Sequence, residues 1–287
     1  MHRFSVLRKS LHDQKWQIIG FGLALGVTAA LDVFIWPAYR EPLQNFELPP
    51  ALQAFLGQLS IATPAGFLSA EYFSWVTILL IVYVVIQGTG AIAGEESSGT
   101  IDLLLAQPVS RRLMVIEKTA AVCIGSVLIV AIGYCGFLVS MPFVSIDVSF
   151  GSVAVASANM LPITLAFFAL SLWLGAVAPN RALAAGAVIG LATAFYFINL
   201  LANGVESLRN LQYATPFYYY GSGLPLVEGI VWWHVGLLMG ASLMFFLATL
   251  RSFEARDIAT GGATDVDLPT MLRRIAGLSA KDVGAGT

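Results

Sequence analysis

Long apolar runs separated by short polar segments make up most of the chain. Six runs are long enough to cross a bilayer, which takes about 20 mostly apolar residues. They cover about residues 17–36, 72–92, 113–141, 153–176, 182–203 and 231–251. The third run is longer than a bilayer requires, so we expect it to tilt or to begin in the cytoplasm. The pattern predicts an all-α polytopic membrane protein with six transmembrane helices.

The composition supports a membrane protein. Hydrophobic residues account for 57% of the 287 residues and charged residues for 11%, whereas a soluble domain carries about 25% charged residues. Mean hydropathy is +0.79. These values exclude a water-soluble enzyme and a disordered chain. The net charge of −2 gives no basic field for nucleic acid, so the lipid bilayer is the expected surroundings.

The basic residues indicate the orientation of the spans. If the N-terminus lies inside, only Arg40 and Arg209 of the 15 lysines and arginines fall in outer segments, and the other 13 fall in inner ones. Cytoplasmic segments of membrane proteins carry such an excess of basic residues. We therefore expect a multi-pass protein of the cell (inner or plasma) membrane with both termini in the cytoplasm. Residues 259–287 form a polar cytoplasmic tail.

Few residues within the spans could carry chemistry. Asp32 is the one acidic residue well inside a span, which makes it a functional candidate, although it could also reach the outer headgroups beside Trp36. His234 is either an interfacial residue or a contact for substrate or protons. Glu117 and Lys118, near the inner end of the third span, could serve as structural anchors or in transport.

The chain lacks the usual signatures of an enzyme. It has no phosphate-binding loop of the G-x-x-x-x-G-K-[ST] type, so it is not expected to bind a nucleotide in that way. We expect no catalytic residues, cofactor or metal site in this chain. An integral membrane enzyme remains one alternative, and a channel or secondary transporter that works without an ATPase is another.

The inner segment between the second and third spans is the most informative part. Residues 94–112 are cytoplasmic by the charge argument, yet they are too apolar for a solvated loop. Thr100 is a plausible N-cap for a short helix, and Pro108 would end it. An apolar helix in this place could fit a groove in a partner protein or lie on the lipid surface. The residues alone leave both open.

This segment resembles a known family. Glu95, the run 99–111 (GTIDLLLAQPVSR) and Lys118 are similar to the E-x-x-x-G-T-[LI]-[ED]-L-L-L-x-x-P-V-S-R…K signature of ABC-2 type permeases. Residues 63–67 (TPAGF), 216–220 (PFYYY) and 253–258 (FEARDI) resemble shorter motifs of the same family. One departure is Ser97, where many relatives carry an acidic residue, which here is displaced to Glu96.

The resemblance implies a permease subunit of an ATP-binding-cassette exporter with a type V exporter-like fold. Two permeases, expected here to be identical copies that form a homodimer, and two ATPase subunits would form the transporter, with ATP and Mg on the ATPase. An N-terminal amphipathic helix (residues 1–16) would lie along the inner surface, followed by the permease domain (17–258). A coupling helix at about 95–106 would contact the ATPase. The expected contact residues are Glu95, Glu96, Gly99, Thr100, Asp102, Leu103, Leu104 and Leu105.

The resemblance also implies a dimer interface made by the first and fifth spans. Gly186 and Gly190 in the fifth span are spaced for close helix contact, although packing within one subunit, or Gly236 and Gly240 in the sixth span, could use the same pattern. The path, nearly free of charge, suits a hydrophobic or amphipathic solute. Candidates for the interface or path are Asp32, Gly186, Gly190 and Tyr196. Short helices at about 205–229 would cap the outer side, with Pro216, Phe217, Tyr218 and Tyr219 as gate candidates.

Overall fold

The computed structural model of the chain describes residues 5–44, 61–94, 111–221 and 224–255, which contain helices and no strand. Six of the helical segments are long and apolar enough to cross a membrane. The main helices of these segments are α1 (Ser5–Gln44), α4 (Ser74–Thr89), α7 (Arg111–Ser140), α9 (Met160–Val177), α10 (Arg181–Gly204) and α12 (Trp232–Ala255). The prediction of a six-helix membrane protein is thus confirmed.

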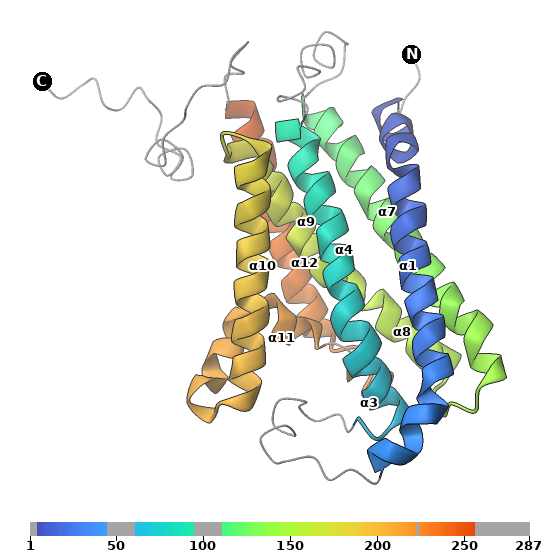
Figure 1. Ribbon diagram of the computed structural model, residues 1–287. Helices are drawn as coiled ribbons and strands as arrows, with labels where there is room; N and C mark the ends of the chain where they lie inside the picture. The colour runs from blue at the N-terminus through green and yellow to red at the C-terminus, as the bar shows by residue number, and fades with distance from the viewer. Residues whose placement is uncertain (1–4, 45–60, 95–110, 222–223, 256–287) are drawn as a thin grey trace, which may run out of the picture.

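Shorter elements extend or connect these helices. Two π-helical turns, η1 (Ser69–Phe73) and η2 (Gly90–Gly94), flank α4, and α3 (Pro64–Leu68) precedes η1. The remaining short elements are η3 (Met141–Phe143), α8 (Phe150–Ala158), η4 (Glu206–Ala214), α11 (Pro216–Tyr220) and η5 (Leu224–Leu226). The N-terminal end of α1, η2 and the C-terminal end of α12 lie at one end of the bundle, and α3 and α11 lie at the other (Figure 1).

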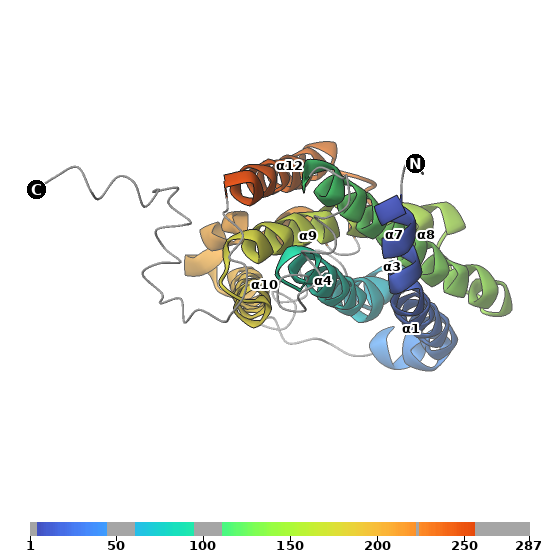
Figure 2. The same ribbon diagram turned by 90° about the horizontal axis from the view of Figure 1, so that it is seen from above.

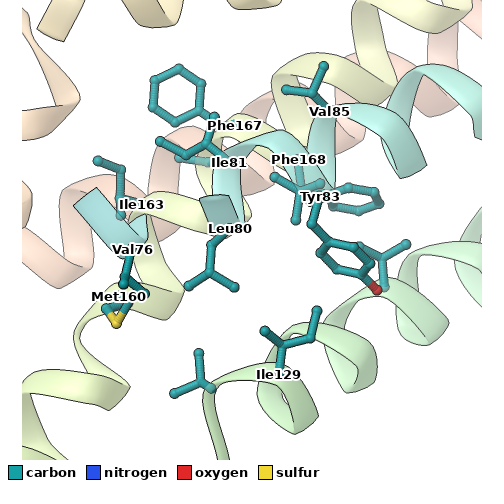
Figure 3. Packing of buried hydrophobic residues seen from close by; sticks show 14 of the residues in the cluster. Val76, Leu80, Ile81, Tyr83, Val85, Ile129, Met160, Ile163, Phe167 and Phe168 are labelled. Atoms are coloured by element: carbon teal, nitrogen blue, oxygen red, sulfur yellow. The ribbon is translucent and has the colours of Figure 1, made fainter. Parts of the chain in front are cut away.

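The bundle has α9 at its centre. In the α8–α9 span, 78% of the most apolar window is buried, compared with 11% in α10 and in α12. Helices α4, α10 and α12 pack around α9, whereas α1 packs chiefly against α7 at one side (Figure 2). Figure 3 shows apolar side chains of α4, such as Leu80, between those of α9, such as Ile163, and Ile129 of α7. In a bilayer, side chains packed in this way hold helices together by van der Waals contacts, which hydrogen bonds between helices supplement.

Glycines allow α1 and α7 to approach closely. A Cβ atom at Gly136 would overlap the carbonyl oxygen of Gly26, and one at Gly22 would lie 2.8 Å from Cδ1 of Ile132. At Gly133 an added Cβ would lie 2.9 Å from Cβ of Leu25. Such contacts leave no space for a methyl group, so this helix crossing depends on its glycines.

The first span differs from the expectation in two ways. Residues 5–16 do not form a separate helix, because α1 is continuous from Ser5 to Gln44. Val6 and Gln14 are buried, so packing and hydrogen bonds hold this end. The first span, expected to end at about residue 36, also continues further, since Pro37 and Pro42 lie inside α1. Each proline removes one backbone hydrogen bond, and the light-blue end of α1 turns away from the rest of the helix (Figure 1).

The fourth span is divided at Asn159, whereas a single helix over 153–176 was expected. Helix α8 ends at Ala158 and α9 begins at Met160. Pro162 cannot donate a hydrogen bond to the carbonyl of residue 158, and its ring crowds that carbonyl. Pro162 thus explains the break.

Candidate functional site

The residues expected to contact an ATPase lie outside the described part of the chain. This applies to the whole predicted coupling helix, from Glu95 to Ala106. The structure does describe the two stems of the 95–110 segment, which are η2 on one side and the start of α7 on the other. The contacts of these stems are therefore the nearest structural information on the predicted site.

Two cations bind backbone carbonyls at the end of the α4 stem. Nζ of Lys118 in α7 donates to the carbonyl of Ala91 over 2.8 Å, and Nη2 of Arg181 in α10 donates to the carbonyl of Ile86 over 3.1 Å. The helix dipole favours cations near the last carbonyls of a helix. Lys118 and Arg181 thus hold this stem to α7 and to α10.

The neighbouring Glu117 makes the opposite contact. Its Oε2 accepts a hydrogen bond of 2.8 Å from the backbone N–H of Leu7, in the first turn of α1. The first turn of α1 contains no acidic residue of its own. Glu117 is 5% exposed, so it is a buried carboxylate at a helix N-terminus, where the dipole favours a negative charge. The sequence-based reading of Glu117 and Lys118 as anchors agrees with these contacts.

Two further hydrogen bonds join α1 to α4 at this end. The hydroxyl of Tyr83 donates to Oε1 of Gln14 over 2.8 Å, and both side chains are buried. Nε2 of Gln87 donates to Oε1 of Gln17 nearby. A buried amide costs free energy without a partner, so Gln14 and Tyr83 satisfy each other. These residues were not singled out from the sequence, which shows their polarity but not their partners.

The first, second and fifth spans lie along one face of the bundle. Figures 1 and 2 show α10, α4 and α1 side by side, with α12 on the opposite side of α9. Between α1 and α10, α4 and the preceding η1 expose a stripe of side chains three or four residues apart. This stripe consists of Glu71 in η1 and of Trp75, Leu79, Val82 and Ile86 in α4. Apart from Glu71 at its outer end, the stripe is apolar.

Asp32 is half-buried on α1, and its atom Oδ2 is buried with no hydrogen-bond partner among the described residues. The carboxylate of Glu71 acts on it electrostatically. The structure therefore does not give Asp32 a counter-ion from the described residues. If Asp32 simply reached the outer headgroups or water, neither carboxylate oxygen would be buried, but Oδ2 is buried.

Gly186 and Gly190 face open space. A Cβ atom at either position would have no atom of another described element within 4 Å, and the same holds for Gly236 and Gly240 in α12. Among the described residues, packing within one subunit therefore does not account for the spacing of Gly186 and Gly190. No described residue covers α10 or α12 at these glycines.

The predicted outer helices are present as η4, α11 and η5. Thr215 forms the N-cap of α11 by accepting a hydrogen bond from the N–H of Tyr218, and Pro216 occupies the first turn, where no donor is needed. Gly221 ends the helix with φ of 65°, which glycine adopts without strain. The T-P…G pattern therefore explains why this short helix forms.

Helix α11 inserts two aromatic side chains into the bundle. The ring of Phe217 lies 5.8 Å from that of Phe167 in α9 and 5.6 Å from that of Tyr196 in α10. The buried hydroxyl of Tyr220 donates to the carbonyl of Phe73 over 3.0 Å and accepts from Oγ1 of Thr77 over 2.8 Å. Burial raises the pKa of Tyr220, so this hydroxyl keeps its proton.

Tyr218 and Tyr219 instead pack toward α12. Their ring centroids lie 5.6 and 5.3 Å from that of His234, and the ring of Tyr219 lies 5.6 Å from that of Trp233. Burial is the main cause that raises the pKa of Tyr218, and Tyr213 adds to it. The four outer-gate candidates thus have three different roles. Pro216 starts α11, Phe217 packs into the core, and Tyr218 and Tyr219 pack against α12.

The likeness to known proteins extends over most of the chain. The model of a family described as "ABC-2 family transporter protein" matches residues 14–258. That range includes all six spans, both stems of the 95–110 segment and the outer helices. No curated protein matches the chain. Within the described residues, no group of three or more His, Cys, Asp or Glu side chains could hold a metal ion.

Proposed function

Because this chain belongs to the ABC-2 family of transporter proteins, we propose that it is the transmembrane permease subunit of an ABC exporter. In this proposal the chain forms the substrate path, and a separate ATPase subunit binds and hydrolyses ATP with Mg. The observation that carries it is the match of 245 of the 287 residues, taken as residues 14–258, to the family. The chain itself then supplies movement and a path rather than catalysis.

The 95–110 segment is the proposed contact with the ATPase. Its stems are held by Lys118 and Arg181, so force applied to the segment would act on α7 and α10 as well as on α4. A helix at 95–106 would seat its apolar residues in a groove of the ATPase. The excess of basic residues supports a cytoplasmic location for this end and for both termini.

We propose that two copies assemble with two ATPase subunits. The open surfaces at Gly186 and Gly190 support an α10 contact between copies, and α1 lies on the same face of the bundle. ATP binding would bring the ATPases together and shift the spans as rigid bodies. The path between α1, α4 and α10 would then open to the outside for a hydrophobic or amphipathic solute.

The coupling assignment is tested by Leu104→Asp. A carboxylate placed in an apolar groove without a partner loses several kcal/mol of binding free energy. We expect the variant to insert and fold but to lose the ATPase during affinity purification. The matched control is Ser97→Asp, which adds the same charge to the same segment at a position where relatives carry an acidic residue, and it should keep the ATPase.

Wild-type ATPase stoichiometry and transport in Leu104→Asp would reject the coupling helix. If the segment instead lies on lipid, Leu104→Asp would weaken its seating on the membrane and leave the ATPase bound. Loss of the ATPase from both variants would show that charge in the segment, rather than its apolar face, decides the contact.

A further inference from the structure

The spans form two groups. Helix α1 packs chiefly on α7, and α4, α10 and α12 pack chiefly on α9. Close glycine contacts join α1 to α7, and Gly88 and Gly175 make a similar close contact between α4 and α9, where a Cβ at Gly175 would lie 3.3 Å from the Gly88 carbonyl oxygen. We call these the α1–α7 pair and the α9 group. Each is closely packed internally, so each can move as a unit.

The two stems of the 95–110 segment belong to different units. The η2 stem continues α4 of the α9 group, and the other stem is the start of α7 in the α1–α7 pair. The hydrogen bond from Lys118 to the carbonyl of Ala91 joins the stems directly. Because Ala91 is 8% exposed, water competes little for its carbonyl. Lys118 therefore links η2 to α7, the two elements that the 95–110 segment connects.

Glu117 extends this connection to α1. It occupies the position before Lys118 and binds the N–H of Leu7 at the start of α1. Thus two adjacent residues of opposite charge each bind the end of another helix, with the sign that each helix dipole favours. A buried carboxylate is costly unless it has partners, so Glu117 is an expensive residue to keep for packing alone. A neutral side chain of similar size would fill the same space.

We propose that Lys118 and Glu117 are positioning residues for coupling. Lys118 makes the two stems move together, and Glu117 transmits the movement of α7 to the N-terminal end of α1. Arg181 acts in parallel by tying the α4 stem to α10. This inference rests on the proposed function, because the movement originates at an ATPase bound to the 95–110 segment. It assigns the route by which that movement reaches the helices facing the path.

The test measures the movement of the two units rather than activity. Spin labels are placed at Val27→Cys in α1 and Leu243→Cys in α12, whose side chains are 57% and 58% exposed, after replacement of Cys123 and Cys135 by alanine. The labelled permease is mixed with an excess of unlabelled permease, so that each complex contains one labelled chain, and the complex is purified through its ATPase subunit. Double electron–electron resonance then gives the distribution of distances between the two labels, without nucleotide and with ATP and vanadate.

Because Lys118 is proposed to make the two units move together, we expect the distance between the labels to be the same in both nucleotide states of the complex with native Lys118. Lys118→Met should make this distance change with nucleotide while the ATPase stays bound, and Lys118→Arg, which keeps a donor, should keep it constant. Lys15→Met is the matched control and should also keep it constant, because Lys15 is exposed and contacts only His12 and Trp16 of its own helix among the contacts described. Glu117→Gln keeps the side-chain volume and provides a second variant, in which the distance should change because α1 no longer follows α7.

A purely structural role predicts a different result. Lys118→Met and Glu117→Gln would then lower the yield or the melting temperature, but the distance in assembled complexes would not change with nucleotide, and this result would overturn the inference. A nucleotide-dependent change of the distance in Lys118→Arg, or in the complex with native Lys118, would overturn it too. If the ATPase does not co-purify with the native chain, the proposed function fails, and the inference fails with it.

Discussion

Tyr220 illustrates how a single side chain can fix an outer helix. Its hydroxyl bonds to Phe73 and Thr77 near the start of α4, and its carbonyl accepts a 2.8 Å hydrogen bond from Nδ2 of Asn159 at the α8–α9 break. The residue therefore joins α11 to two spans. It is 3% exposed, so these bonds are protected from water.

We expect Tyr220→Phe to lower the free energy of unfolding by about 1–2 kcal/mol, the usual cost of losing a buried hydrogen bond. The loss is limited because Thr77 still donates to the carbonyl of Phe73. Thermal unfolding in detergent, followed by dye binding to exposed thiols, measures the change. Tyr219→Phe is the control, since that hydroxyl is exposed and water can replace it. Equal effects of both substitutions would argue against the burial explanation.

Residue roles were only partly predictable. The sequence marked Phe217, Tyr218 and Tyr219 through family resemblance, but it did not distinguish Tyr220, because an identical residue type repeats three times and only the structure shows which one faces inward. Asp32 was recognised because a charge within an apolar run is conspicuous. The hydrogen bond between Glu117 and Leu7 joins residues 110 positions apart in the sequence, and no local sequence pattern predicts a contact between residues so far apart.

At the scale of elements, the α1–α7 crossing depends on glycine and the exposed surfaces do not. Gly136 contacts the backbone of Gly26, whereas Gly236 in α12 has open space where a side chain would start. The same substitution should therefore have opposite effects at the two positions. This contrast separates contact between backbones from helix propensity.

Gly136→Ala should destabilise the protein by about 1–3 kcal/mol, the range for overpacking a core. Gly236→Ala should be neutral or stabilise the isolated subunit by up to about 1 kcal/mol, since alanine favours helix more than glycine does. Melting temperatures of the two variants in the same detergent measure the difference. A stable Gly136→Ala protein with unchanged melting temperature would show that α1 and α7 can separate at no cost.

Element positions were predictable where hydrophobicity decides them. All six spans occur at the predicted places, because apolar length is a direct consequence of bilayer thickness. Breaks and ends were less predictable: the division at Asn159 and the extension of α1 past Pro37 depend on proline geometry in a particular tertiary setting. The close glycine packing at Gly22 and Gly26 was missed, although their spacing is visible in the sequence.

At the scale of the whole molecule, burial is uneven. Both α10 and α12 leave most of their apolar surface uncovered, and each carries two glycines that face open space. In a bilayer either surface could meet lipid or another protein. Only one of them lies on the face that α1 and α4 share (Figure 2).

If α10 forms the contact between copies, Gly190→Leu should shift the purified permease from dimer to monomer, because the larger side chain keeps the two backbones apart. Gly240→Leu on α12 is the matched control and should leave the dimer intact. Light scattering coupled to size-exclusion chromatography, corrected for detergent, measures the mass. The reverse outcome would place the contact on α12.

The orientation of the chain can be tested at the tail. A cysteine replacing Ser279, with Cys123 and Cys135 changed to alanine, should react with a membrane-impermeant maleimide only after cells are opened. The excess of basic residues on one side is the reason. A cysteine replacing Glu206, between α10 and α11, should react in intact cells. Labelling of the Ser279 position in intact cells would contradict the predicted orientation.

The π-helical turns at both ends of α4 have a geometric consequence. A π turn contains one residue more than the α-helical turn it replaces, and one residue corresponds to about 100° of rotation along an α-helix. Conversion of η2 to α-helical spacing would therefore rotate everything beyond it by roughly that angle relative to α4. The same holds for η1 at the other end. Helix α4 thus has a π turn at each end. Gain or loss of one such turn would rotate its stripe of exposed side chains toward or away from α1 and α10, while the length of the helix would change by one residue at most.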